Sequence, residues 1–255
     1  MKAASFNVNS IRARLPIVLD WLKAESPHIL CLQETKVIDE DFPLQPFLEM
    51  GYHAAFRGEK SYSGVAILSR APLVNVRYGF DNGDYASRLI RASVGGIEIV
   101  NTYVPQGFHP LSKQFREKLD WLQRLYDCFN AAFTPASPVL WLGDFNVAPE
   151  PDDVYDPQKM TGQVGYHPDE RAVLEMFLRW GFVDVFRVHQ TGPGHFTFWD
   201  YRIKNGVKGN IGWRVDHIWA TRALARKSVK AWIDKGPRLR ERPSDHTPVV
   251  AEFKL

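Results

Sequence analysis

Residues 139–147 (VLWLGDFNV) limit most strongly how this chain can fold. Four apolar residues lie between a proline and a glycine, a run long enough for a buried β-strand and too short for an independent helix. In extended geometry, Asp144 and Asn146 place their side chains on one face while Phe145 points to the other. The stretch predicts a core strand that ends in a carboxylate and an amide, although a strand ending in an Asx turn gives the same sequence.

Other apolar runs are followed by polar residues in the same way. Residues 2–8 predict a strand that leads, through a cap at Asn9 or Ser10, into apolar residues at helical spacing up to Leu22. Residues 28–33 predict a strand covered on both faces, with Glu34 directly after it. Further strands are predicted at 52–57, 64–69, 73–78, 89–94, 97–103, 195–201, 213–220 and 247–255, with a tight turn at residues 95–96.

Helices are fewer than strands and fall between them. Apolar residues at helical spacing predict a long helix over 112–130, and Pro168 opens another that reaches about Trp180. Residues 148–168 are rich in Pro, Gly and Asp and are expected to form a loop. About a dozen strands with few helices predict an α/β fold in which two sheets pack face to face with the helices outside.

No segment of the chain divides it into parts. With 255 residues, 45% of them hydrophobic, and no Ser/Gly-rich linker or internal repeat, we expect 1–255 to form a single domain. Cys31 and Cys128 lack a C-x-x-C spacing, so we expect free thiols and a reducing compartment. Without a signal peptide or a membrane-spanning stretch, the chain is expected to be a soluble cytoplasmic protein.

Positive charge is concentrated toward the C-terminal end of the chain. The net charge is only +3, but residues 202–242 contain 12 Lys or Arg against three acids. Such a segment is typical of a surface that binds a polyanion, and a solvated basic surface has the same composition.

Eight polar residues stand at or near the ends of separate predicted strands. Each alone has a structural explanation, as an exposed acid, half of an ion pair or a hydrogen-bonding histidine. The edges of two packed sheets converge on one rim, however, so eight such residues together predict a common site. They are Asn7, Glu34, Tyr103, Asp144, Asn146, Asp216, Asp245 and His246.

The oxygen ligands in this set match a magnesium site. Mg²⁺ takes one or two protein carboxylates and keeps water and substrate phosphate in its other positions. Glu34 and Asp245 can supply such carboxylates, with Asn7 nearby.

The other members of the set match the remaining needs of phosphodiester hydrolysis. Asp144 can deprotonate a water that Asn146 orients. Charge that builds on the phosphate oxygens needs donors, which His246, held protonated by Asp216, and the Tyr103 hydroxyl can provide.

Eight segments, taken in order, resemble one known family. They are FNVNSIRA (6–13), LQETK (32–36), GVAILS (64–69), NTYVPQG (101–107), LGDFNVA (142–148), FTFWDYR (196–202), GWRVDHI (212–218) and SDHTPV (244–249). From end to end, the chain resembles the exonuclease III family of apurinic/apyrimidinic (AP) endonucleases, within the endonuclease/exonuclease/phosphatase superfamily. GDFN and SDH alone would indicate only the superfamily.

The resemblance implies a four-layered α/β sandwich of the DNase I type, in which two mixed β-sheets are flanked by helices. It implies a DNA repair enzyme that depends on Mg²⁺, with Mn²⁺ able to substitute. It further implies incision of double-stranded DNA 5′ to abasic sites, with 3′-to-5′ exonuclease activity and trimming of blocked 3′ ends. We expect a monomer with no membrane partner.

The resemblance also implies a role for each matching residue. The expected catalytic residues are Tyr103, Asp144, Asn146, Asp216 and His246. The expected metal contacts are Asn7, Glu34, Asp144, Asn146, Asp245 and His246. Phe198, Trp213 and Val215 fall where the family lines a pocket for the flipped-out abasic sugar.

Two departures from the family pattern affect the expected substrate contacts. Gln106 stands where other members have Asn, and the loop after Gly107 is shorter than in some relatives, which puts phosphate contacts and processivity in question. Two alternatives remain open at this point. One is a lesion-binding protein without turnover, and the other is a superfamily phosphoesterase on a non-DNA substrate.

Overall fold

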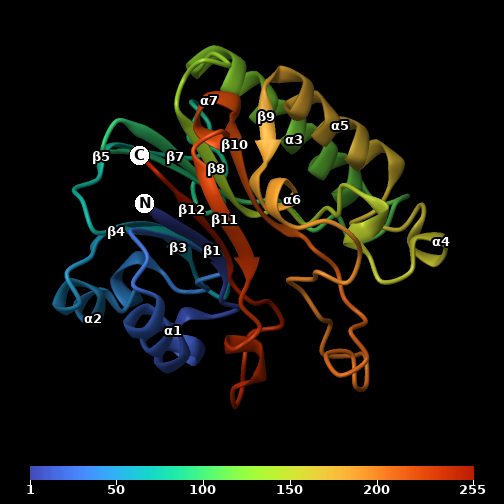
Figure 1. Ribbon diagram of the computed structural model, residues 1–255, viewed down its shortest axis with the longest axis horizontal. Helices are drawn as coiled ribbons and strands as arrows, with labels where there is room; N and C mark the ends of the chain where they lie inside the picture. The colour runs from blue at the N-terminus through green and yellow to red at the C-terminus, as the bar shows by residue number, and fades with distance from the viewer.

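Two six-stranded β-sheets form the centre of the computed structural model, which describes residues 1–255 (Figure 1). The first sheet contains, in spatial order, β11 (Ser228–Ile233), β12 (Val249–Phe253), β1 (Lys2–Asn7), β2 (Ile29–Gln33), β4 (Tyr62–Ser69) and β3 (His53–Glu59). The second contains β5 (Val74–Tyr78), β6 (Leu89–Val94), β7 (Ile97–Tyr103), β8 (Val139–Asp144), β10 (Asp216–Thr221) and β9 (Phe182–Asp184).

Each sheet has one parallel pair at its centre, β1 with β2 and β7 with β8, and antiparallel pairs elsewhere. Both sheets are therefore mixed, as predicted. The carboxyl ends of parallel neighbours lie at the same edge of a sheet, so residues that follow β1 and β2 meet, as do those that follow β7 and β8. This arrangement brings the predicted polar residues to one edge.

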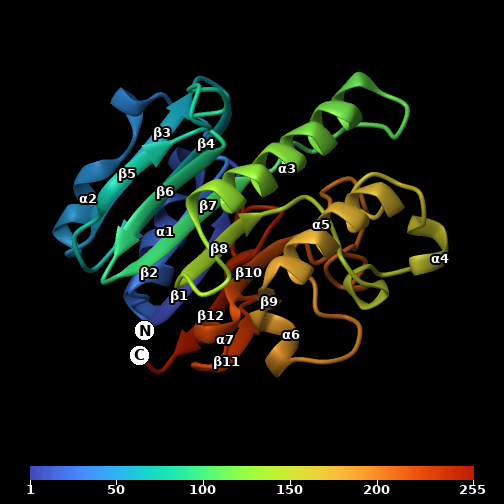
Figure 2. The ribbon, with the colours of Figure 1, turned by 90° about the horizontal axis from the view of Figure 1, so that it is seen from above.

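Helices cover the outer faces of both sheets, which gives the predicted four layers (Figures 1 and 2). Helix α1 packs Val18, Trp21 and Leu22 against one face of the first sheet. Helices α3 and α5 cover the second sheet with an aromatic cluster. The helices are α1 (Ile11–Glu25), α2 (Leu44–Glu49), α3 (Lys113–Ala132), α4 (Pro157–Met160), α5 (Pro168–Trp180), α6 (Val185–His189) and α7 (Arg222–Ala225), with 3-10 turns at Asp39–Asp41, Pro151–Asp153 and Pro237–Leu239.

The space between the sheets is filled mainly by small and β-branched side chains. Ala3, Ala92 and Ala251 lie there beside Ile and Val residues from both sheets. One polar link crosses this core, because Gln33 donates to the Asn101 side chain over 2.7 Å. Asn101 in turn donates to two carbonyls of the first sheet, so this side chain of the second sheet is bound by three groups of the first.

Most predicted elements are confirmed, and three predictions differ from the structure. Residues 195–201 form no strand, because Phe198 makes isolated bridges to two different segments, at Trp213 and His246, instead of one continuous ladder. The strand predicted from Trp213 begins three residues later, at Asp216. The loop predicted over 148–168 contains a 3-10 turn and the short helix α4. The predicted Gly95-Gly96 turn is confirmed, with positive φ at both glycines.

None of the helices combines the length and the apolar composition that crossing a membrane would require. Cys31 and Cys128 are both free, as predicted.

Candidate active site

The strand ends bring Asn7, Glu34, Tyr103 and Asp144 together at one edge of the sandwich. The Asn7 amide donates from Nδ2 to Glu34 Oε1 and to Asp144 Oδ2, each over 2.9 Å. Asn7 ends β1 and Glu34 follows β2 in the first sheet, and Asp144 ends β8 in the second, so this amide joins the two sheets. Its own oxygen accepts from the Asn9 backbone N–H. Asn7 therefore orients both carboxylates with every polar atom of its side chain satisfied.

Two glycines allow these strand ends to approach their neighbours closely. A Cβ on Gly143, at φ +149°, would lie 2.1 Å from the Thr102 carbonyl oxygen on β7. A Cβ on Gly64, at φ +97°, would lie 2.0 Å from Thr35 Oγ1 in the turn that carries Glu34. A side chain at either position would displace a catalytic strand end, which explains the glycine before Asp144.

The segment after β8 turns sharply, which corrects the predicted extended geometry. Asn146 has φ 50°, and its backbone N–H donates to Asp144 Oδ1 over 2.8 Å, forming the Asx turn that was weighed as the structural explanation. The turn still brings the Asn146 amide back toward Asp144, with Nδ2 3.3 Å from Oδ2. Phe145 is fully buried, as predicted. The Asx turn that was weighed as the structural explanation is therefore present, and the catalytic roles of Asp144 and Asn146 stay predictions.

His246 and Asp216 form a second buried pair beside Asp144. His246 Nδ1 donates to Asp216 Oδ2 over 2.8 Å, and its Nε2 lies 3.9 Å from Asp144 Oδ2. Asp216 lies directly opposite Asp144 in the antiparallel β8–β10 pair. The imidazole therefore directs Nε2 toward the space beside Asp144.

The electrostatics of this cluster favour a protonated histidine and a basic aspartate. Burial would lower the pKa of His246, but Asp216 and Asp144 outweigh burial and raise it to about 10. Burial raises the pKa of Asp144 to about 7, with Asp216 and Glu34 acting in the same direction against His246 and Asn7. For Glu34, burial also raises the pKa, yet hydrogen bonds from Lys36 and Asn7 leave it lowered. At neutral pH, His246 is therefore a cation and Glu34 is a carboxylate, while Asp144 is close to the midpoint of its titration.

Tyr103 lies beside the same carboxylates. Burial, with the charges of Glu34 and Asp144, raises the pKa of Tyr103 well above its ordinary value. The Arg88 guanidinium stacks on the ring, 4.5 Å from its centroid. The hydroxyl therefore stays protonated and can act as a hydrogen-bond donor.

Asp245 joins the cluster indirectly, and two residues that the sequence analysis missed make the connection. Asn9 Nδ2 donates to Asp245 Oδ1 over 2.9 Å, and Asn9 Oδ1 accepts from Lys36 Nζ over 2.6 Å. Lys36 also forms an ion pair with Glu34 over 2.7 Å. Their positions in the sequence could have identified both residues, because each lies two positions after a predicted site residue. The role of Asp245 as a metal contact stays a prediction.

The cluster can hold a metal ion. Ligand atoms of Glu34, Asp144 and His246 all lie within 4.8 Å of one another. Glu34 and Asp144 supply the carboxylate oxygens of this group, and the roles of His246, Asn7 and Asn146 as metal contacts stay predictions. Hard oxygen donors of this kind suit a divalent ion such as Mg²⁺.

Phe198, Trp213 and Val215 line one pocket of about 210 Å³ next to this cluster, as predicted. Asn146 and Gln106 belong to the same lining, which connects the pocket to the Asp144 turn. Phe198 also contacts His246, with ring centroids 4.8 Å apart. The pocket is therefore continuous with the candidate catalytic groups.

Buried charges that the sequence analysis missed hold the pocket and the Asp144 turn in place. Arg214 is fully buried and donates to Asp153 over 2.7 and 2.9 Å and to Asp184 over 2.7 Å. Its Nη1 lies 3.0 Å from His217 Nδ1, and an arginine can only donate, so Nδ1 accepts and the Nε2–H donates to the Val147 carbonyl. Burial and Arg214 lower the pKa of His217 to about 4, which keeps it neutral.

Lys118 is a further buried cation beneath the turn. It pairs with the buried Glu170 and donates to the carbonyls of Asn146, over 2.8 Å, and Gln106, over 3.2 Å. Both carbonyls belong to segments that line the pocket. Lys118 therefore connects the loop that contains Gln106 to the turn that contains Asn146.

Comparison with known proteins identifies the family to which this chain belongs. The profile of the Endonuclease/Exonuclease/phosphatase family matches residues 4–246, a range that includes every predicted site residue. The chain belongs to this family. The comparison confirms the family resemblance drawn from the eight sequence segments.

Three relatives match this family member with both chains fully covered. Exodeoxyribonuclease III of Haemophilus influenzae is 34% identical over 275 residues, with both chains fully covered. The structure of an AP endonuclease from Archaeoglobus fulgidus matches with a TM-score of 0.97 and 46% identity, again over both complete chains. The 3′-5′ exonuclease NExo from Neisseria meningitidis matches with a TM-score of 0.96 and 36% identity over both complete chains.

Proposed function

We propose that this DNA repair nuclease cuts duplex DNA on the 5′ side of abasic sites and also removes nucleotides and blocking groups from 3′ ends. The observation that carries the proposal is the continuity of the Asp144 and His246 cluster with the Phe198–Trp213–Val215 pocket. The similarity to AP endonucleases and to the NExo exonuclease supports both activities. The Neisseria 3′ phosphatase NExo, 34% identical to this chain, has been solved with a product DNA hairpin.

In the proposed reaction, Asp144 accepts a proton from the attacking water. Its pKa of about 7 places it near the pH at which a general base works best. The Asn146 amide, held by the Val104 carbonyl over 2.9 Å, orients that water. The Asp144–Asn146 turn thus supplies both the base and the group that aims the nucleophile.

The groups facing Asp144 would stabilise the phosphate as its negative charge grows. The protonated His246 can donate from Nε2, and Asp216 preserves its charge and orientation. Tyr103 can donate a further hydrogen bond from its neutral hydroxyl. Glu34 would hold Mg²⁺, which polarises a phosphate oxygen when bound, and Asp144 would stay free to act as the base.

The pocket provides the proposed selectivity for abasic sites. A volume of about 210 Å³ lined by Phe198, Trp213 and Val215 suits a sugar better than a complete nucleotide. Rotating a nucleotide out of the duplex costs least where no base has to be unstacked. Lesion choice would therefore follow from both the size of the pocket and the cost of extrusion.

The first test is incision of a labelled duplex that carries one abasic-site analogue. We expect cleavage immediately 5′ to the lesion with Mg²⁺ or Mn²⁺, and loss of cleavage when EDTA removes the metal. An undamaged duplex of the same sequence is the control. Tight binding to the lesion without cleavage would contradict the proposal and favour a lesion-binding protein. Phosphate release from inositol phosphates without DNA incision would favour a different phosphoesterase.

Enlarging the pocket should reduce discrimination between abasic and undamaged duplexes. We expect Trp213→Ala to lower this ratio of kcat/KM values by about tenfold, because hydrophobic contacts that shape a pocket contribute on the order of 1–3 kcal/mol to selectivity. Trp180→Ala, which removes a partly buried tryptophan from the end of α5, should leave the ratio unchanged. Unaltered discrimination in Trp213→Ala would remove this pocket from the account of specificity.

We further propose that the chain acts as a cytoplasmic monomer. Its two free cysteines suit a reducing compartment. Light scattering on the purified chain at the concentrations of the cleavage assay would test the oligomeric state.

A further inference from the structure

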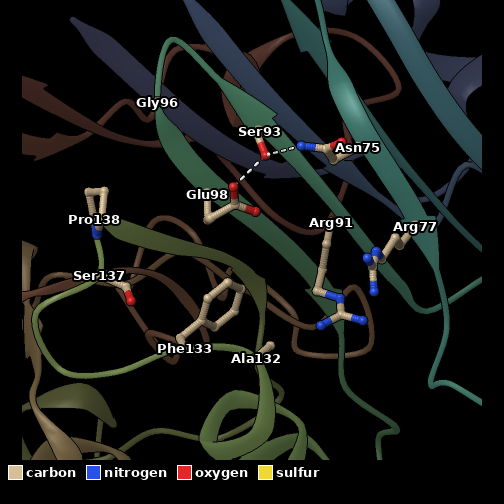
Figure 3. A pocket seen from close by; sticks show the side chains of 10 residues that line it. All are labelled: Asn75, Arg77, Arg91, Ser93, Gly96, Glu98, Ala132, Phe133, Ser137 and Pro138. Atoms are coloured by element: carbon tan, nitrogen blue, oxygen red, sulfur yellow. Dashed lines mark hydrogen bonds between the residues drawn. The ribbon is translucent and has the colours of Figure 1, made fainter.

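A second cavity lies at the opposite end of β7 from Tyr103. It has a volume of about 600 Å³ and is open to solvent between the β5–β6–β7 part of the second sheet and the end of α3 (Figure 3). It shares no residue with the pocket beside the catalytic cluster. Its lining residues are Asn75, Arg77, Arg91, Ser93, Gly96, Glu98, Ala132, Phe133, Ser137 and Pro138.

One end of this cavity holds two arginines, and only one of them has an acidic partner. Arg77 and Arg91 are directly opposite each other in the β5–β6 pair, and Figure 3 shows their guanidinium groups side by side. Like charges at opposed positions destabilise a sheet unless something compensates them. Arg77 forms no ion pair, and the partner of Arg91 is Asp81, 3.6 Å away, with 85% of its side chain exposed.

Arg91 is also insufficiently hydrogen-bonded for its burial. Only 6% of the residue is accessible, and its Nε has no hydrogen-bond partner. A buried guanidinium with an unpaired N–H is costly, and its planar donors fit the oxygens of a phosphate. This end of the cavity therefore has the composition of an oxyanion site.

The other end of the cavity differs in character. The Phe133 ring and the Glu98 side chain face the same space (Figure 3). Glu98 is held by Ser93, which also accepts from Asn75 over 3.4 Å, so its carboxylate is fixed and can accept hydrogen bonds from a ligand. An aromatic face and an acceptor suit a nucleobase, and the volume lies in the range of small-molecule sites.

We propose that this cavity binds a nucleotide-sized phosphate monoester, with its phosphate between Arg77 and Arg91 and its base toward Phe133 and Glu98. The site does not depend on the nuclease chemistry, since none of its residues belongs to the catalytic cluster. Its ligand could reach it as a free mononucleotide or, for the phosphate end alone, as inorganic phosphate.

Isothermal titration calorimetry in EDTA, which keeps divalent metal away from the catalytic cluster, tests the site. The probes are deoxyadenosine 5′-monophosphate, inorganic phosphate and deoxyadenosine. We expect the mononucleotide to bind with 1:1 stoichiometry and more tightly than phosphate, and deoxyadenosine not to bind. Phosphate that binds as tightly as the mononucleotide would overturn the assignment of the base, and no mononucleotide binding at millimolar concentration would overturn the site.

Three variants test whether the mononucleotide binds in this cavity. Arg77→Gln changes an exposed residue and should weaken mononucleotide binding by about tenfold or more, because it removes charge-assisted hydrogen bonds to the phosphate. Lys23→Gln removes an exposed positive charge from α1, on the other outer layer, and should leave binding unchanged. Arg91→Lys retains the charge but loses the planar fork, and it should also weaken binding while its Tm confirms folding. Equal affinity in the wild type and Arg77→Gln would place the ligand elsewhere.

Discussion

Replacing Asp144 with Asn is expected to reduce kcat on an abasic duplex by about a thousandfold, because a positioned general base contributes roughly 10²–10⁴ in rate. The amide has nearly the same shape but cannot accept the water proton. Asp144 Oδ1 and Oδ2 both accept hydrogen bonds, from Asn146 N–H and from Asn7, so the variant keeps one of these contacts and loses the other. DNA affinity should change little, because Asp144 is buried and does not belong to the lining of the pocket.

Single-turnover cleavage and fluorescence anisotropy on the same duplex separate these two effects. Asp127→Asn makes the same chemical change on the exposed face of α3 and should retain wild-type cleavage. The Tm of both variants must be measured, since the lost Asn7 contact is buried. Wild-type cleavage by a folded Asp144→Asn protein would exclude Asp144 as the base, and equal losses in binding and cleavage would assign it to DNA binding.

Replacing Asp153 with Asn is expected to lower the free energy of unfolding by about 3 kcal/mol, because breaking a buried ion pair leaves its partner charged and uncompensated. Asp153 accepts two hydrogen bonds from Arg214 and also pairs with Arg187. Urea unfolding followed by tryptophan fluorescence measures the change. Asp152→Asn alters the neighbouring acid, which is partly exposed and has no ion pair, and should have an effect near zero.

This effect should depend on pH in a direction set by the pKa of Asp153. Burial would raise that pKa, but Arg214 and Arg187 outweigh burial and lower it from 3.8 to about 2. A carboxylate with a depressed folded-state pKa stabilises the protein fully above pH 3.8 and loses that contribution as pH falls through about 2. The stability difference between the wild type and Asp153→Asn should therefore be constant near neutral pH and narrow toward pH 2. A difference that widened on acidification would contradict this explanation.

The residues of the candidate site were predictable where each directly follows an apolar strand. Asn7, Glu34, Tyr103 and Asp144 all belong to this group, since a buried strand fixes where its last side chain lies. The packing of two mixed sheets was predictable for a similar reason, because the strand runs have distinct lengths and boundaries. In these cases the local pattern and the tertiary structure agree.

What could not be predicted depends on contacts between distant segments. Residues 195–201 have a strand-like composition, but their hydrogen bonds divide between the segments around Trp213 and His246. Arg214 lies within a strand-like segment, and no local pattern shows that its partners are 61 and 30 residues away. Asn146 has a backbone conformation that an alternation rule excludes.

Two hydrogen bonds of the site, from Asn7 to Asp144 and from His246 to Asp216, connect one sheet to the other. The catalytic machinery is therefore assembled from two half-sites, and the interior between the sheets acts as a spacer that sets their separation. That spacer consists largely of alanines and β-branched residues, whose volumes determine how closely the sheets approach. Substitutions deep in this layer can change the alignment of base and phosphate donor without altering any residue that touches DNA. Evolution can thus tune the activity of such an enzyme from its interior.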